Sequence, residues 1–403
     1  MSDKEVFSGA GSEAFSGAGS GAGSGAGSGA GSGAGSGAGS GAGNEGFSIG
    51  HGTLHEALRR NREAICVPEK GGRYQPANYK QLRVGDDVED LDTLNLKLAR
   101  SEPWVIGYLG VHDLLSRLSY TACDDSVTVL VDQKPSLIIT RPNLKQFEVE
   151  LPEVIDLAQY REDRQSEILV QRSDTSLFWQ SILPWNASAF PNTAALLNIA
   201  MQTVIYVHMR LKHDFACLRP DQLSPQVQAF IPTPRHGAFP MGHMAEAAVT
   251  YQLLSALTKG QASIGSPSSQ WLELQDQLWR QARRIGDNRV VAGVHFPIDL
   301  VGGAAVGMWV ARFIMASCDK VYGSEFAGNF SFTSDKYTAA TRLDLLSSEA
   351  TLWASLDSKV EKEILPTSAL LQNLWIGARK EWAKLDAGLT ASKNLQKIKI
   401  DNN

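Results

Sequence analysis

Three short segments in the middle of this 403-residue chain carry side chains that could bind and transform an oxyanion. Together they supply three cations, two imidazoles and one carboxylate, which are Lys212, Arg219, Arg289, His243, His295 and Asp299. Guanidinium and ammonium groups hold the oxygens of an anion, and an imidazole can serve as a nucleophile, a ligand or an acid–base group. The set predicts a site for a tetrahedral oxyanion such as phosphate or vanadate.

The first segment, Lys212-x6-Arg219-Pro220, follows a predicted apolar helix. Arg219 offers a planar fork of donors and Lys212 offers a compact charge, and both suit an oxyanion. Pro220 is expected to stop the helix and turn the chain. Taken alone, the two cations are better explained as a basic last turn that complements the helix dipole.

The second segment, Pro240-Met241-Gly242-His243, comes directly before a predicted helix. The amides of a first helical turn have no intrahelical acceptor, and with the positive end of the dipole they favour an anion. A glycine there lets a ligand approach the backbone closely. His243 could then act as acid or base beside the anion, although a Gly-His pair alone is a weak signal.

The third segment is Arg289-x5-His295-x3-Asp299. Pro297 suits the first turn of a helix, so His295 is expected just outside that helix. The Asp299 carboxylate lies four residues on and can reach the imidazole if the turn closes. Such a carboxylate fixes the tautomer and makes the other ring nitrogen a better nucleophile or ligand.

The elements that must position these side chains are predicted mainly as helices, with apolar residues at helical spacing. The predicted helices cover 154–172, 176–183, 192–211 with Asn192 as the cap, 242–258, 269–285, 298–316, 343–360 and 367–385, with a link at 287–296. Alternation at 127–131 and 136–139 indicates short strands. The predicted fold class is mainly α, a helical bundle with an irregular N-terminal region that holds short strands.

Composition divides the chain into four parts. Residues 1–49 are a low-complexity Gly/Ala/Ser linker with a repeated Gly-Ala-Gly-Ser unit, expected to be disordered, with a silk-like stacked sheet as the alternative. Residues 50–150 form the N-terminal region of the fold, 151–320 the helical core, and 321–403 a C-terminal helical extension.

Charge, cysteine content and hydrophobicity limit the class of protein. The formal net charge of −5 argues against a nucleic-acid binder. The four cysteines Cys66, Cys123, Cys217 and Cys318 form no CxxC pair, which favours reduced thiols. With no signal-like N-terminus, and with Arg312 inside the longest apolar stretch (300–317), we expect a cytoplasmic protein without a membrane span. Its apolar, tryptophan-bearing helices would permit a homo-oligomer.

In this order, the three segments resemble the superfamily of type-2 phosphatidic acid phosphatases and vanadium haloperoxidases. Its signature is Lys-x6-Arg-Pro, then Pro-Ser-Gly-His, then Ser-Arg-x5-His-x3-Asp, and the resemblance covers roughly residues 150 to 320. Two positions depart from the signature, because Met241 and Asn288 stand where the family has serine. Met241 cannot donate the hydroxyl hydrogen bond to a bound oxyanion.

The resemblance implies a role for each matching residue. His295 would attack phosphorus in a phosphatase, or coordinate the vanadium of vanadate in a haloperoxidase. The oxyanion would be held by the three cations and by the second segment; this set is Lys212, Arg219, Met241, Gly242 and Arg289. His243 would be the acid–base group, and Asp299 would support His295.

His236 and the lack of convincing membrane spans favour the haloperoxidase branch. His236 lies five residues before Met241, where bromide-oxidising haloperoxidases typically have histidine. The resemblance thus implies a vanadate-dependent enzyme that oxidises halide, bromide first, with hydrogen peroxide and passes the halogen to an organic acceptor. Two alternatives stay open: a soluble acid phosphatase acting through a phosphohistidine, and a relative impaired by Met241.

Overall fold

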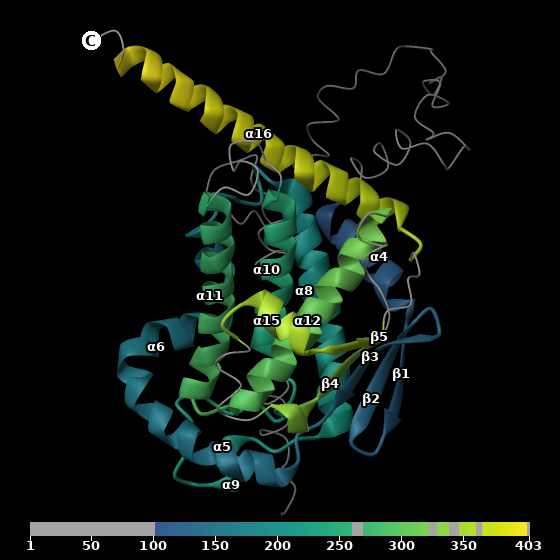
Figure 1. Ribbon diagram of the computed structural model, residues 1–403, viewed down its shortest axis with the longest axis vertical. Coiled ribbons are helices and arrows are strands. Elements are labelled where there is room, and N and C mark those ends of the chain that lie inside the picture. The colour runs from purple at the N-terminus through teal and green to yellow at the C-terminus, as the bar shows by residue number, and fades with distance from the viewer. Residues whose placement is uncertain are drawn as a thin grey trace, which may run out of the picture.

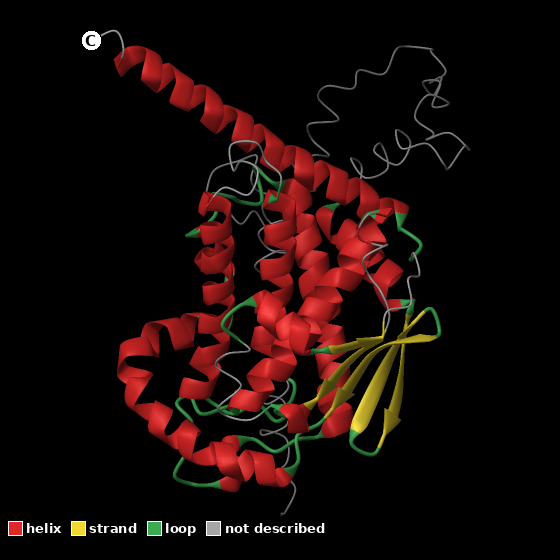
Figure 2. Cartoon of the chain, viewed as in Figure 1, coloured by secondary structure: helices red, strands yellow, loops and turns green. Residues whose placement is uncertain are grey.

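The computed structural model describes residues 101–259, 269–320, 322, 329–337, 346–359 and 365–400. The predicted linker at 1–49, the first half of the N-terminal region and Cys66 lie outside these residues. Where it is described, the chain is mainly helical, as predicted (Figure 2).

Long helices form the centre of the molecule (Figure 1). They are α8 (Pro191–Phe215), α10 (Gly242–Thr258), α11 (Ser269–Val291) and α12 (Pro297–Cys318). Helix α10 packs against each of the other three. A further long helix, α16 (Ala369–Ile400), crosses one end of this bundle and contacts α8, α10 and α12.

Shorter helices surround the bundle. They are α4 (Pro103–Leu115), α5 (Leu144–Asp156), η2 (Leu157–Tyr160), α6 (Arg161–Val170), α7 (Ser176–Gln180), α9 (Pro220–Leu223), η4 (Ser334–Lys336) and α15 (Glu349–Ser355). Helices α5, α6 and α9 lie at the end of the bundle away from α16 (Figure 1).

A five-stranded sheet lies beside the bundle, in the order β1 (Leu118–Cys123), β2 (Ser126–Val131), β3 (Lys134–Thr140), β4 (Asn329–Thr333), β5 (Asp357–Lys359). The first three strands are antiparallel neighbours, and the two predicted strands fall within β2 and β3. Strand β3 pairs in parallel with β4, which follows the helical core in sequence. The sheet therefore joins segments that precede the helical core in sequence to segments that follow it.

Helix α12 is the centre of the hydrophobic core. It is long and apolar enough to cross a membrane, alone in this respect among the described helices, and 94% of its most apolar window is buried inside the protein. Two glycines let it approach α10: a Cβ at Gly303 would stand 2.4 Å from the Met241 carbonyl oxygen, and one at Gly307 would stand 2.3 Å from that of Ala245. The apolar stretch 300–317 thus lies within a buried helix of the core.

Several predicted boundaries were wrong. The segment 154–172 is divided among the end of α5, η2 and α6, and the segment 343–360 holds the short α15 followed by β5. Helix α11 continues beyond residue 285 to Val291, so Arg289 lies within it rather than in a link. Helix α8 begins at Pro191 with Phe190 at the cap position; the predicted cap, Asn192, lies in the first turn.

The start of α8 is capped from another helix. The Glu381 carboxylate on α16 accepts hydrogen bonds from the amides of Asn192 and Thr193 at 2.7 and 3.0 Å, and from both side chains. A long-range carboxylate therefore performs the capping that the sequence suggested for a local amide.

Candidate oxyanion site

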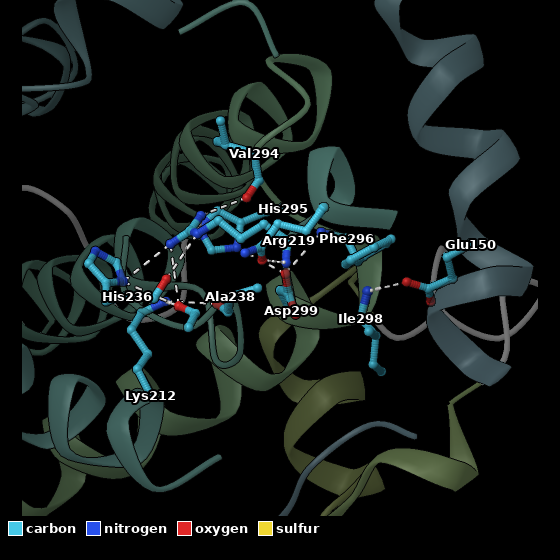
Figure 3. A network of polar contacts seen from close by, with 12 residues as sticks. Glu150, Lys212, Arg219, His236, Ala238, Val294, His295, Phe296, Ile298 and Asp299 are labelled. Carbon is cyan, nitrogen blue, oxygen red and sulfur yellow. Dashed lines mark hydrogen bonds and ion pairs between the residues drawn. The ribbon is translucent and has the colours of Figure 1, made fainter. Parts of the chain in front are cut away.

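The three sequence segments meet at the end of the bundle opposite α16. The C-terminal ends of α8 and α11 supply Lys212 and Arg289, and the N-terminal ends of α10 and α12 supply His243 and Asp299. Figure 3 shows Lys212, Arg219, His236, His295 and Asp299 in one network of polar contacts. The fold thus brings together side chains up to 87 positions apart in sequence.

Lys212 and Arg219 are buried and directed at backbone carbonyls. The Lys212 Nζ donates to the Gly237 and Ala238 oxygens at 3.0 and 2.7 Å. The Arg219 guanidinium donates to the Val294 oxygen at 2.6 Å and to the His236 oxygen at 3.1 Å. Burial, helped by the Arg219 charge, lowers the pKa of Lys212 to about 7, and burial lowers the pKa of Arg219 to about 10.

Arg219 reaches the site because the chain reverses after α8. The helix ends at Phe215, and Ala216 adopts a left-handed conformation with φ of 46°. Pro220 then begins the short helix α9, and Gln222 accepts from the Arg219 amide at 2.8 Å. The turn predicted at Pro220 is therefore made four residues earlier, and the proline starts the next helix.

Arg289 is the cation with the most unused donor capacity. Its Nη2 donates to the Ile168 oxygen at 2.9 Å, whereas Nε and Nη1 have no hydrogen-bond partner among the described residues. The side chain is only 1% exposed, and burial lowers its pKa to about 10. Buried unpaired donors on a cation are costly, so these two nitrogens favour an anionic acceptor.

His295 and Asp299 form the buried pair that the spacing predicted. The His295 Nδ1 lies 2.9 Å from the Asp299 Oδ2, which also accepts from the Phe296 amide at 2.9 Å. The other ring nitrogen, Nε2, lies 3.3 Å from the Arg219 Nη1. Since a guanidinium can only donate, Nε2 must carry the lone pair and Nδ1 the hydrogen.

The environment of the pair shifts both pKa values toward the neutral forms, lowering that of His295 and raising that of Asp299. Burial, and then the charges of Arg219 and Lys212, hold the pKa of His295 well below its usual value. Burial raises the pKa of Asp299 to about 7. His295 is thus a neutral imidazole at neutral pH, and the lone pair on its Nε2 is directed at the Arg219 guanidinium.

The second segment starts α10 as predicted, with Met241 at the cap position. The Met241 amide donates to the Asp299 carbonyl oxygen at 2.9 Å, and its side chain is fully buried in the apolar core. Met241 therefore brings neither a hydroxyl nor a free amide to an anion, although it was included among the predicted oxyanion-binding residues. Gly242 packs against the His208 ring: a Cβ added at Gly242 would lie 2.9 Å from the Cε1 atom of His208.

His243 is held by a carbonyl that the sequence did not indicate. Its Nε2 lies 3.2 Å from the backbone oxygen of Gln171, at the end of α6. Burial, and then the Arg289 charge, lower the pKa of His243 to about 4. The side chain is therefore neutral before an anion arrives.

His236 contacts the Arg219 guanidinium, the cation that also faces His295. Its Nδ1 lies 3.2 Å from the Arg219 Nη2, and burial followed by the charges of Lys212 and Arg219 lowers its pKa to about 4. The loop histidine singled out in the sequence is therefore half-buried and in contact with Arg219.

Two polar clusters at this site were missed in the sequence. The first is a His208–Glu246 pair between α8 and α10, with Nε2 and Oε1 3.1 Å apart. The second joins Glu167, Gln171 and Asn288, where the Asn288 Nδ2 donates to both other side chains at 2.9 Å. The available signals were weak: His208 precedes Lys212 by one helical turn, and Glu246 follows His243 by three residues.

The site is built from cations and imidazoles rather than from a set of metal ligands. Among the described residues, no three His, Cys, Asp or Glu side chains gather as they would to hold a metal ion. The chemistry of the donors, with two unpaired Arg289 nitrogens, instead suits an oxyanion such as phosphate or vanadate.

Comparisons with known proteins are sparse. No family model and no curated protein matches the chain. Among solved structures, the chain is similar to the "first transmembrane PAP2 type phosphatidylglycerolphosphate phosphatase from Bacillus subtilis", at 18% sequence identity and a TM-score of 0.28. That match covers 55% of this chain and 86% of the other.

Proposed function

We propose that the chain hydrolyses phosphate monoesters through a phosphohistidine at His295. The observation that carries the proposal is the orientation of this imidazole. Asp299 holds Nδ1 at 2.9 Å, and the lone pair on Nε2 faces the Arg219 guanidinium. A neutral, oriented imidazole beside a group that binds oxyanions has the features of a nucleophile for phosphoryl transfer.

In the first step, the His295 Nε2 forms a bond to phosphorus as the bond from phosphorus to the ester oxygen breaks. His243 gives a proton to the departing alkoxide, so the alcohol leaves neutral. In the second step, water attacks the phosphorus, His243 takes a proton from it, and the nitrogen–phosphorus bond breaks. Inorganic phosphate and both imidazoles are restored.

The cations stabilise the charge on the transferring phosphoryl group. Arg289 offers Nε and Nη1, and Arg219 and Lys212 can exchange carbonyl acceptors for phosphate oxygens. A bound phosphate also opposes the Arg289 charge that depresses the pKa of His243. Binding thereby makes His243 able to hold the proton that it must donate.

His236 supports a second candidate, a vanadate-dependent haloperoxidase. The fit is chemical, since Lys212, Arg219 and Arg289 would hold vanadate oxygens and His295 Nε2 would be its ligand. Vanadate so bound would supply activation of hydrogen peroxide for halide oxidation. The observation that favours this candidate is the contact of His236 with Arg219, because the resemblance associates histidine at this position with bromide oxidation.

The experiment uses full-length protein freed of metal and phosphate, divided into two assays. The first follows p-nitrophenyl phosphate hydrolysis and traps the acid-labile phosphoenzyme. The second adds orthovanadate, hydrogen peroxide and bromide, and follows bromination of a β-diketone. His295→Ala is the test variant, and His213→Ala is the matched control, because His213 is exposed beside Lys212.

Ester hydrolysis and a trapped phosphoenzyme, both lost in His295→Ala and kept in His213→Ala, would support the phosphatase. Bromination without hydrolysis would replace it with the second candidate. Neither activity in a folded protein would contradict both and leave a relative disabled at Met241.

A further inference from the structure

His243 and His295, the two histidines proposed to take part in the reaction, are held in opposite tautomers. His295 accepts at Nε2 from a guanidinium that can only donate, so its hydrogen is on Nδ1. His243 has Nε2 3.2 Å from the Gln171 carbonyl, which can only accept, so its hydrogen is on Nε2. The lone pair of His243 is therefore on Nδ1.

The carbonyl that selects this tautomer is fixed by buried side chains. Gln171 is 1% exposed and is the C-cap residue of α6, and its backbone amide donates to the backbone oxygen of Glu167. Its side-chain Oε1 accepts from the Asn288 Nδ2 at 2.9 Å, and Asn288 is itself fully buried on α11.

Asn288 also forms hydrogen bonds with the charged side chains of Glu167 and Arg164. The Glu167 Oε2 accepts from the Asn288 Nδ2 at 2.9 Å and from the Arg284 Nε at 2.8 Å. Arg164 donates to the Asn288 Oδ1 at 3.3 Å. The residue that replaces the family serine thus ties the last turns of α6 and α11 together.

We propose that Gln171 and Asn288 are positioning residues that hold His243 as its Nε2–H tautomer, so that His243 exchanges protons through Nδ1. The exchange itself rests on the proposed phosphatase reaction: Nδ1 takes up a proton from solvent when the phosphate ester binds, gives it to the departing alkoxide and regains one from the attacking water. The tautomer does not depend on that reaction.

Four groups act on His243 from the elements packed around it. They are Arg289 on α11, Glu246 on α10, His208 on α8 and the Gln171 carbonyl at the end of α6. Of these, only the Gln171 carbonyl forms a hydrogen bond to the ring among the described contacts. The tautomer therefore depends on the place of this carbonyl, which Asn288 helps to fix.

The test is a long-range proton–nitrogen NMR correlation on full-length protein labelled with ¹⁵N-histidine, which distinguishes the two tautomers of a neutral ring. The chain has eight histidines, and His243→Gln and His295→Gln assign the two signals. We expect Nε2–H for His243 and Nδ1–H for His295 in the wild type. A wild-type His243 that is Nδ1–H, or an equal mixture, would overturn the proposal without any variant having to fold.

Two variants test the positioning role. Gln171→Met and Asn288→Leu keep the Gln171 carbonyl but remove its anchor, and we expect a mixed tautomer and a fall in kcat of about tenfold with little change in KM. Gln202→Met is the matched control, because Gln202 donates a partly buried hydrogen bond to Asn198 on α8. An unchanged Nε2–H tautomer in both folded variants would refute the role of these side chains.

The NMR and kinetic results also separate this inference from the proposed function. The predicted tautomer in a protein without ester hydrolysis would sustain the positioning of His243 and refute only the phosphatase. Hydrolysis with the opposite tautomer would sustain the phosphatase and refute the positioning.

Discussion

At the residue scale, the site combines donors that are already satisfied with donors that are not. Lys212 and Arg219 are bonded to backbone carbonyls, whereas Arg289 keeps two buried nitrogens without partners among the described residues. An anion therefore gains most from Arg289, because the other cations must give up existing hydrogen bonds. Arg289 should control affinity for the anion, and His243 and His295 should control the chemistry.

Arg289→Lys tests this division. Lysine keeps the charge but loses the planar fork, so we expect the affinity for inorganic phosphate to fall about 10- to 100-fold, which corresponds to roughly 1.5–3 kcal/mol. Isothermal titration with phosphate measures the change. Arg172→Lys is the control, since Arg172 is exposed and acts on Arg289 only through its charge. Equal affinity in the two variants would contradict the role of the fork.

Met241→Ser introduces, at a fully buried position, the serine of the signature that the sequence resembles. Removing a buried thioether leaves a cavity and buries a hydroxyl, so we expect a loss of about 2–4 kcal/mol in the free energy of unfolding. Urea denaturation measures it. The partly buried Met201→Ser on α8 should lose clearly less. If Met241→Ser were as stable as the wild type, its side chain would not be part of the packed core.

At the element scale, the best predictions came from helices with strong local signals. Helix α10 has the predicted bounds, and α12 begins at Pro297, because a glycine and a proline mark their first turns. The pairing of His295 with Asp299 followed from their spacing alone. The last six residues of α11 were misjudged, since its last turn is stabilised by contacts with α6 that no local pattern reveals.

Much of the environment of the site depends on such long-range packing. Gln171 contributes a backbone carbonyl, which any residue carries, so its identity gave no signal. Glu246 and His208 come from different helices, and only their contact at 3.1 Å marks them as a pair. Residue types predicted the anion-binding chemistry, while the tautomers required the fold.

The close approach of α12 to α10 gives an element-scale prediction. Gly303→Ala and Gly307→Ala place a methyl group against backbone oxygens, and each should cost about 1–3 kcal/mol of stability. A Cβ at Gly303 would meet Met241, two residues before His243, so this variant should also lose about 10- to 100-fold in kcat. Gly307, one turn farther along, should keep most of its activity, as steady-state kinetics on folded protein will check.

Comparing the activities of Gly303→Ala and Gly307→Ala separates a local effect on the start of α10 from damage to the whole bundle. A similar loss of activity in Gly307→Ala would indicate general damage to the bundle. Full activity in Gly303→Ala would mean that the start of α10 tolerates displacement.

At the scale of the whole molecule, burial of the site links stability to pH. The pKa values of His208, His236, His243 and His295 are all lowered in the folded protein, chiefly by burial. A histidine whose pKa is depressed in the folded protein contributes stability that is fully present at pH values above its unfolded-state pKa, near 6.5. This contribution is lost as pH falls toward the folded-state pKa. Asp299 acts in the opposite sense, since its raised pKa favours folding at low pH.

We therefore expect the anion-free protein to lose stability between pH 6.5 and pH 4, at roughly 1–2 kcal/mol for each affected histidine. Urea unfolding at a series of pH values measures this loss. His243→Gln should show a shallower dependence than the wild type, whereas His213→Gln, which alters an exposed residue, should not. Equal slopes in all three proteins would contradict the assignment of a neutral, buried His243.

The parallel pairing of β3 with β4 has a consequence for biosynthesis. Strand β3 is made before the helical core, and its partner β4 is made after it. While the ribosome translates the residues between them, one edge of β3 has no partner and presents free amides and carbonyls to any other nascent chain. Chains that terminate early, before Asn329, keep that edge open permanently, so they are the ones expected to aggregate and to engage chaperones.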